Sequence, residues 1–207
     1  MIETLQQLDS DLLLALNGLH ADWLDQLMYT LSGKWIWVPF YVMLLYFVWR
    51  RNRKLTPTAD VRRTVLCLAC IALAITAADQ LCATVLRPIF ERPRPANIDS
   101  PIQALVHIVN DYRGGHYGFP SCHAANSFAL AAFMIMFFKN NLARFGMIFW
   151  AVTLCYTRIY LGVHYPGDLL VGALIGSMCG FAFYAVYRNL CRVRPAEVPF
   201  LGRMVKN

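Results

Sequence analysis

Charged side chains are scarce in this chain. Asp, Glu, Lys and Arg make up only 15% of its 207 residues, against roughly 25% in an ordinary soluble domain. Hydrophobic residues reach 58% instead. This balance excludes a disordered chain, a basic nucleic-acid-binding protein and a small disulfide scaffold. The sequence therefore predicts a membrane protein, with one membrane-embedded domain over residues 1–207.

Five long apolar segments predict helices that cross the membrane. A bilayer core of about 30 Å needs about 20 mostly apolar helical residues, and backbone that faces lipid must be helical. The segments are 31–49, 65–86, 121–138, 145–157 (continuing towards 163) and 169–187. The predicted fold class is all-α, a polytopic bundle of about five transmembrane helices with its core at 31–187.

The first thirty residues have a different pattern. Four aspartates interrupt their short apolar runs, namely Asp9, Asp11, Asp22 and Asp25. Residues 1–30 therefore predict amphipathic helices that lie in the membrane interface rather than a further span. At the other end, residues 188–207 predict a cytoplasmic tail.

Basic residues predict the orientation. Thirteen of the 19 Lys and Arg residues fall in three connections on one side of the predicted bundle, 50–63, 139–144 and 188–206. The positive-inside rule makes that side cytoplasmic. The long loop 87–120 and the segment 158–168 then face outward. We expect a multi-pass protein of a bacterial-type cytoplasmic (inner) membrane, with its site on the periplasmic side.

Three polar clusters fall on the outward side of this topology. Their sequences are RPIFERPRP at 87–95, PSCH at 120–123 and TRIYLGVHYPGD at 157–168. Ionisable groups at membrane depth are costly and usually belong to a site or a pathway. The clusters are therefore the candidate functional residues.

Their residue types indicate phosphoryl transfer. Arginine matches phosphate oxygens and keeps its charge, and Ser121 and Cys122 are predicted at a helix N-terminus, which favours an anion. Asp168 lies four residues after His164, so it can hold one ring nitrogen and leave the other as a nucleophile. His123 can protonate a leaving oxygen. The pattern predicts transfer of a phosphoryl group from an ester to histidine and then to water.

In their order the clusters resemble the motifs of the type 2 phosphatidic acid phosphatase family, which shares its fold with vanadium haloperoxidases. The family pattern is Lys-x6-Arg-Pro, Pro-Ser-Gly-His and Ser-Arg-x5-His-x3-Asp. The corresponding residues are Arg87-x6-Arg94-Pro95, Pro120-Ser121-Cys122-His123 and Thr157-Arg158-x5-His164-x3-Asp168.

The resemblance implies a role for each matched residue. The catalytic residues would be His164 as nucleophile, His123 as general acid and Asp168 as the partner of His164. Phosphate would be bound by Arg87, Arg94, Ser121, Arg158 and the backbone at Cys122. No cofactor and no metal ion would be needed. Three residues depart from the pattern, Arg87 for Lys, Cys122 for Gly and Thr157 for Ser, and we expect Cys122 to alter the fit of the phosphate.

Several polar residues have a structural interpretation instead. Spacing selects Arg94 for the motif, which leaves Arg92 open between a solvated or headgroup-facing charge and a part in the site. Asp79 is expected to pair with a polar group inside the bundle. Structural roles are also expected for His20, His107 and His116, and packing roles for Cys67 and Cys70. A zinc site at His123, His164 and Asp168 is disfavoured because the nearby arginines would repel a cation.

The predicted function is dephosphorylation of a lipid phosphate or diphosphate through a phosphohistidine. Undecaprenyl diphosphate or a phosphatidate-type lipid ranks first, because so short a chain leaves little room for a soluble recognition domain. Lipid A and phosphatidylglycerol phosphate are the alternatives. A non-catalytic membrane protein that binds anionic lipids is a more distant one. The expected partners are the substrate and membrane lipids, without nucleic acid.

Overall fold

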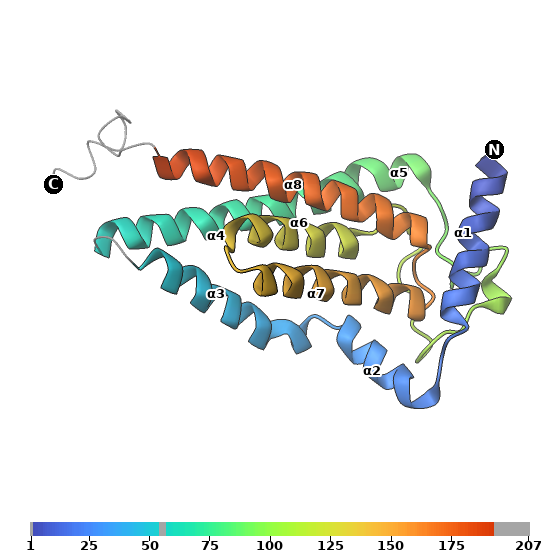
Figure 1. Ribbon diagram of the computed structural model, residues 1–207. Coiled ribbons are helices and arrows are strands. Elements are labelled where there is room, and N and C mark those ends of the chain that lie inside the picture. Colours follow the sequence, from blue (N-terminus) through green and yellow to red (C-terminus); the bar gives the residue numbers. More distant parts are fainter. Residues whose placement is uncertain (1, 54–56, 193–207) are drawn as a thin grey trace.

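The computed structural model describes residues 2–53 and 57–192, and all regular elements among them are helical (Figure 1). The N-terminal part contains α1 (Ile2–Asn17), α2 (Asp22–Ser32), the short turn η1 (Trp35–Trp37) and α3 (Val38–Asn52). Next come α4 (Pro57–Gln80), the π-helical η2 (Leu81–Leu86), α5 (Arg87–Phe90) and η3 (Gln103–Leu105). The last helices are α6 (Cys122–Phe137), α7 (Asn141–Tyr160) and α8 (Pro166–Arg192). The all-α fold class is confirmed.

Not every predicted span has the length and hydropathy to cross a bilayer. Among the described residues, Pro57–Phe90 and Pro166–Arg192 qualify alone, and α2 with Trp35–Asn52 qualifies only as one span bent by 72°. The segment predicted at 31–49 is broken at residues 33–34, and α6 is apolar but only 16 residues long. Helices therefore occupy all five predicted segments, while two to three are candidate spans. Of the predicted tail at 188–207, residues 193–207 lie outside the described residues.

Helix α8 packs closely on α6 through glycines at every fourth position. A Cβ on Gly176 would collide with the carbonyl oxygen of Ala125, and one on Gly172 would collide with that of Ser121. Gly180 repeats the contact one turn further on. Small residues let two helix backbones approach in a membrane. This contact aligns the first turn of α8 with the first turn of α6.

The opposite face of α8 is apolar and exposed. Leu170, Leu174, Met178 and Phe181 form a stripe along it, with exposed fractions of 48% to 71%. An exposed apolar stripe of this length is a liability in water but suits the hydrocarbon of a bilayer. The chain is a membrane protein, and this stripe is one of its lipid-facing surfaces.

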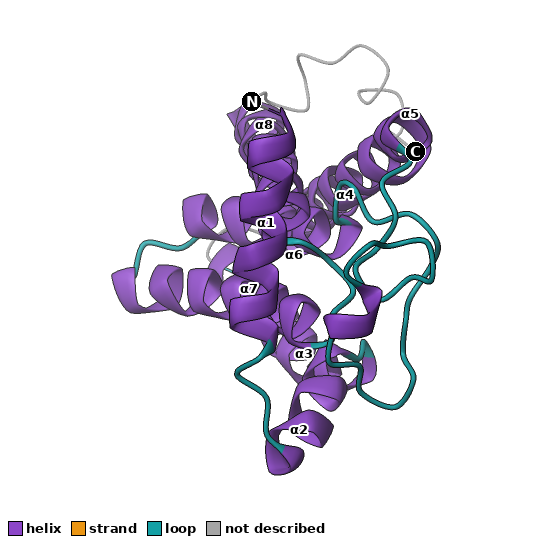
Figure 2. Ribbon diagram, turned by 90° about the vertical axis from the view of Figure 1, so that its right-hand side faces the viewer, coloured by secondary structure: helices purple, strands orange, loops and turns teal. Residues whose placement is uncertain are grey.

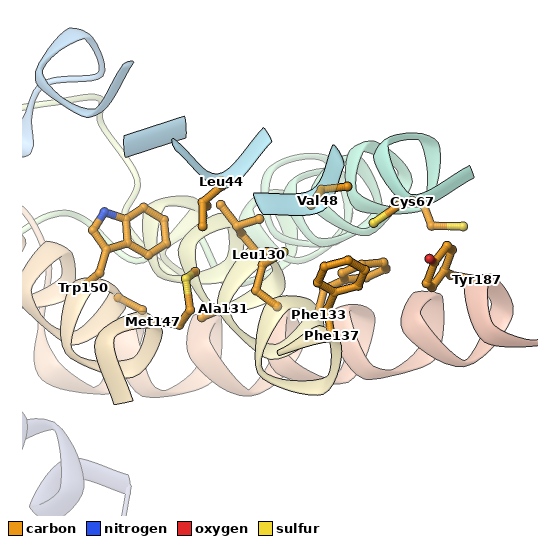
Figure 3. Packing of buried hydrophobic residues seen from close by; sticks show 13 residues of the cluster. Leu44, Val48, Cys67, Leu130, Ala131, Phe133, Phe137, Met147, Trp150 and Tyr187 are labelled. Atoms are coloured by element: carbon orange, nitrogen blue, oxygen red, sulfur yellow. The ribbon is translucent and has the colours of Figure 1, made fainter. Parts of the chain in front are cut away.

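The largest buried cluster fills the space between the helices of the bundle (Figure 3). It takes side chains from α3, α4, α6, α7 and α8, among them Leu44, Val48, Cys67, Leu130, Phe133, Phe137, Met147, Trp150 and Tyr187. Cys67 and Cys70 belong to it as free thiols, which agrees with their predicted packing role.

One end of the bundle is covered by α1 and by the long loop that joins α5 to α6 (Figure 2). The side-chain amide of Asn17, at the end of α1, donates to the carbonyl of Tyr160 over 2.8 Å, and its oxygen accepts from the amide of His107 over 2.8 Å. At this end α7 finishes and α6 and α8 begin (Figure 1). The three polar clusters consequently meet here.

Candidate functional site

The first turns of α6 and α8 are tied together at the base of the site. Ser121 is the N-cap of α6, and its Oγ accepts from the amide of Ala124 over 3.4 Å. Its own amide donates to the carbonyl of Asp168 over 3.0 Å. The next two amides, of Cys122 and His123, lie in the first helical turn, where no intrahelical acceptor exists. An anion placed there meets N–H groups and the positive end of the helix dipole.

His164 lies between α7 and α8, with only 1% of its surface exposed. Its Nε2 lies 3.0 Å from Nη1 of Arg94, and its Nδ1 lies 3.4 Å from Oδ2 of Asp168. A guanidinium can only donate, so Nε2 must accept and the ring proton must be on Nδ1. Asp168 is fully buried and also accepts the amide of Tyr165 over 3.1 Å. The lone pair of Nε2 thus points into the arginine cluster.

The charge state of His164 follows from its surroundings. Burial, and then the positive charges of Arg94 and Arg158, hold the pKa of His164 well below its usual 6.5. Burial and the nearby Arg87 lower the pKa of Arg94 to about 10, so Arg94 stays charged at neutral pH. The site therefore combines a neutral imidazole with charged guanidinium groups.

The other two arginines come from α5 and α7. The guanidinium of Arg158 donates through Nη2 to the carbonyl of Ser32 over 2.9 Å and through Nη1 to the hydroxyl of Tyr112 over 3.4 Å. Arg87 donates through Nη2 to Sγ of Cys122 over 2.9 Å. Its buried Nε has no hydrogen-bond partner within the part of the chain that the structure describes. A buried donor of this kind is normally satisfied, and a phosphate oxygen is a fitting acceptor.

His123 follows Cys122 in the first turn of α6. Burial and then the positive charge of Arg158 hold the pKa of His123 well below its usual 6.5, so its free imidazole is neutral at pH 7. It also lines a cavity of about 540 Å³ that extends between α3, α4, α6 and α7. The cavity walls are mostly aliphatic and aromatic, and its polar lining comes from Lys34, Asp79, Cys122, His123, Asn126 and Ser127.

Two sequence interpretations can be tested at neighbouring residues. The sequence left the role of Arg92 open, and the structure places it in ion pairs rather than in solvent: its Nη1 lies 2.8 Å from Oδ2 of Asp9 and 2.9 Å from Oδ1 of Asp168. The expected pairing of Asp79 is confirmed, since its Oδ1 accepts the side-chain amide of Asn126 over 2.9 Å.

Gly118 is a site residue that sequence reasoning missed. A Cβ at this position would lie 3.1 Å from Oδ2 of Asp168 and 3.1 Å from Cγ of Arg94, so a side chain would crowd the carboxylate. A single glycine in a loop that already holds Gly114 and Gly115 carries no signal of this role. For the zinc alternative, the described residues contain no group of three or more His, Cys, Asp or Glu side chains that could hold a metal ion.

Comparison with known proteins places this site in a family. A family model described as the PAP2 superfamily matches residues 68–192, which include all three clusters. The chain belongs to the PAP2 superfamily. A lipid A 4'-phosphatase of Bacteroides thetaiotaomicron is 45% identical to this PAP2 protein, over 98% of the chain and 87% of the relative. A lipid A 4'-phosphatase of Porphyromonas gingivalis is 32% identical, over 90% and 75% of the two chains.

Solved PAP2 structures have the same fold. The crystal structure of LpxE from Aquifex aeolicus aligns with a TM-score of 0.62 and 25% identity, covering 86% of this chain and 95% of that one. The transmembrane PAP2-type phosphatidylglycerolphosphate phosphatase of Bacillus subtilis aligns with a TM-score of 0.62 at 23% identity, covering 92% and 90%. The predicted family and phosphatase activity are confirmed, while the roles of individual site residues stay predictions.

Proposed function

We propose that this PAP2 phosphatase hydrolyses a phosphate monoester of the lipid A headgroup through a phosphohistidine on His164. The reaction takes place at the outer face of the cytoplasmic membrane. The observation that carries the proposal is that Cys122 and His123 line an apolar cavity while Cys122 accepts a hydrogen bond from Arg87, so the cavity borders the arginine cluster. An acyl chain fits apolar walls inside the bundle, while a phosphate fits the arginines at its end. A substrate with both parts is a lipid phosphate.

The geometry supports an in-line displacement. Nε2 of His164 attacks phosphorus, forming the P–N bond as the P–O bond to the lipid breaks. The leaving oxygen takes a proton from His123, whose ring lies on the cavity side and gains that proton once the negative charge of the bound phosphate offsets the nearby arginines. Water then attacks phosphorus and gives a proton to His123 as the P–N bond breaks. Inorganic phosphate leaves, and both imidazoles return to their starting states.

The surrounding residues favour the transition state. Arg87, Arg94 and Arg158 bring three positive charges to the equatorial oxygens, where negative charge is spread during transfer. Arg94 donates to Nε2 of His164 in the structure. When Nε2 attacks phosphorus, the same N–H of Arg94 donates to a phosphate oxygen instead. Asp168 stabilises the ring as it gains positive charge, because its carboxylate accepts a hydrogen bond from the N–H at Nδ1.

Lipid A replaces undecaprenyl diphosphate as the preferred substrate. Support comes from the two lipid A 4'-phosphatases, which match this chain over 90% or more of its length. An undecaprenyl-diphosphatase of Sulfolobus acidocaldarius is 28% identical over 72% of the chain. The lipid A alternative from the sequence is therefore the better supported one.

The test is phosphate release by the purified full-length protein in detergent. Bisphosphorylated lipid A, undecaprenyl diphosphate, phosphatidylglycerol phosphate and phosphatidate serve as substrates. We expect lipid A to have the highest kcat/KM, by about tenfold or more, and mass spectrometry to show loss of one phosphate. Faster turnover of undecaprenyl diphosphate would overturn the substrate assignment.

Substitution of His164 tests the phosphohistidine mechanism separately from the choice of substrate. His164→Ala should abolish turnover and the acid-labile phosphoprotein seen in rapid-quench experiments. His116→Ala is the matched control, because His116 is half-exposed and pairs with Asp99 outside the site. Orthovanadate should inhibit and chelators should not. Normal turnover by His164→Ala would exclude the nucleophile, and binding of lipid A without turnover by the wild type would favour the non-catalytic alternative.

A further inference from the structure

Arg92 lies outside the family motif, yet it contacts the carboxylate that faces His164. Its Nη1 lies between two carboxylates, 2.9 Å from Oδ1 of Asp168 and 2.8 Å from Oδ2 of Asp9. Its guanidinium also stacks on the ring of Tyr165, 3.7 Å from the centroid. Three contacts from three segments hold this side chain in one place.

Asp9 joins the N-terminal helix to the same point. Its Oδ1 accepts the amide of Gly167 over 2.7 Å, in the first turn of α8. The amides in the first turn of a helix have no acceptor within the helix, and the carboxylate of Asp9 provides one for Gly167. Asp9 therefore holds both the start of the helix that carries Asp168 and the arginine that binds Asp168. Its side chain is only 15% exposed, and that of Arg92 is 22% exposed.

The two oxygens of Asp168 have separate partners. Oδ2 faces Nδ1 of His164 and the amide of Tyr165, while the hydrogen-bond partner of Oδ1 in the described part of the chain is Arg92. Without that contact the carboxylate can rotate about its Cβ–Cγ bond, and its buried charge loses its nearest positive partner.

We propose that Arg92 and Asp9 are positioning residues for the phosphatase reaction: Arg92 orients the carboxylate of Asp168 towards His164, and Asp9 acts through Arg92. The inference rests on the proposed function. Groups that orient a catalytic side chain commonly contribute about 10- to 100-fold to activity, although they do not touch the substrate. We expect the variants to lower kcat rather than raise KM, because Arg92 and Asp9 contact Asp168, Gly167 and Tyr165 and not the arginines predicted to bind phosphate.

The experiment compares the full-length wild type with Arg92→Gln, Arg92→Lys, Asp9→Asn and the Asp9→Asn/Arg92→Gln double variant. Phosphate release from bisphosphorylated lipid A gives kcat and KM, and inhibition by orthovanadate reports on the arginine cluster separately. For Arg92→Gln we expect kcat to fall about 10- to 100-fold, with KM and vanadate inhibition changed less than about threefold. Arg92→Lys, which keeps the charge, should recover part of the loss.

The double variant tests whether Asp9 acts through Arg92. If it does, the double variant has the kcat of Arg92→Gln, and Asp9→Asn alone causes a smaller loss. Multiplicative losses would overturn that step of the inference. A parallel loss of vanadate inhibition and of thermal stability in every variant, Arg92→Lys included, would assign both residues a general folding role and overturn the proposal.

Arg113→Gln is the matched control. Arg113 is an arginine of the same long loop that pairs with the exposed Asp111 and donates to the carbonyl of Ala96, not to a predicted site residue, so the variant should keep the wild-type kcat. Unchanged kcat in Arg92→Gln would reject this inference and leave the proposed function standing. If the wild type releases phosphate from none of the lipids in the panel, the proposed function fails first, and the inference falls with it.

Discussion

Two of the residues that depart from the PAP2 motif are in contact with each other. Arg87 stands where the family pattern has Lys, Cys122 stands where it has Gly, and the guanidinium of Arg87 donates to the sulfur of Cys122 over 2.9 Å. Cys122 has a helical backbone, so no positive φ is imposed on it. The thiol fills part of the space that a glycine leaves open and provides an acceptor for the bulkier arginine. The pair acts as one unit.

Replacing each residue by the one in the family pattern, singly and together, tests whether Arg87 and Cys122 depend on each other. Arg87→Lys and Cys122→Gly should each lower kcat/KM by about tenfold, because each removes the contact between the guanidinium and the sulfur. The double variant restores the family pattern and should recover to within about threefold of the wild type. The measurement is phosphate release by all four proteins. Losses that simply multiply in the double variant would show that the two positions act independently.

The pKa of His164 predicts the pH dependence of the reaction. Protonation would remove the lone pair of Nε2, but burial and then Arg94 and Arg158 keep the pKa of His164 well below 6.5. The active neutral form therefore persists as the pH falls through 6.5, and the acid limb of kcat/KM should lie below that value.

The Arg94→Gln variant checks the cause of this shift. It removes one of the positive charges that lower the pKa of His164, so its residual activity should show the acid limb at higher pH. The comparison uses the shape of the two profiles between about pH 4 and 9, not their amplitudes. An acid limb at the same pH in both proteins would contradict the electrostatic explanation.

At the level of elements, the α6–α8 contact determines the geometry of the site. The amide of Ser121 donates to the carbonyl of Asp168, and the glycine stripe of α8 sets the spacing of the two helices. The small residues of α8 predict that it packs closely on a neighbour. The sequence does not predict that this neighbour is α6, or which residues of the two helices face each other. Gly172 and Gly176 face backbone carbonyls four residues apart on α6, so one register satisfies both.

Enlarging the contact should separate the helices. In Gly176→Leu the side chain collides with the carbonyl of Ala125. Overpacking costs about 1–3 kcal/mol, which corresponds to a fall in Tm of roughly 2–12 °C for a chain of this size. Phosphate release should fall as well, because Asp168 moves relative to Ser121.

Leu174→Ala is the control for this variant, because Leu174 lies on the exposed stripe of the same helix. It should leave Tm and activity close to the wild type in detergent. Equal effects of the two substitutions on Tm would show that the register of α6 and α8 does not depend on the glycine contact.

The helix that precedes the site has a feature that periodicity could not predict. Between Leu81 and Leu86 the backbone is π-helical, and the amide of Arg87 donates to the carbonyl of Cys82, five residues earlier. A π segment rotates everything after it relative to an uninterrupted α-helix, and such segments are frequent at functional sites. Here the rotated residue is Arg87.

At the level of the whole molecule, the site lies at one end of the bundle. The connection between α6 and α7 and the end of α8 lie at the other end (Figure 1). Among the described residues, the basic side chains outside the site lie mostly at the remote end, such as Arg50, Lys139 and Arg188, and the positive-inside rule predicts from this an outward-facing site.

Sidedness can be measured with an inserted protease site. Inserted at Ile98, an exposed residue of the long loop, it should be cut in intact spheroplasts. Inserted after Asn140, which is exposed between α6 and α7, it should be cut only after the membrane is opened. The reverse pattern would place the site in the cytoplasm and would rule out the proposed location.

The sequence by itself determined the helical class and the phosphatase family. The class follows from local hydropathy, although only two to three of the five predicted segments are candidate spans, and the four-residue step from His164 to Asp168 spans about one helical turn. Only the tertiary structure decided that Arg92 joins Asp9 to Asp168 and that Arg87 meets Cys122. Such contacts connect residues 35 to 83 positions apart, and their partners depend on how the helices pack.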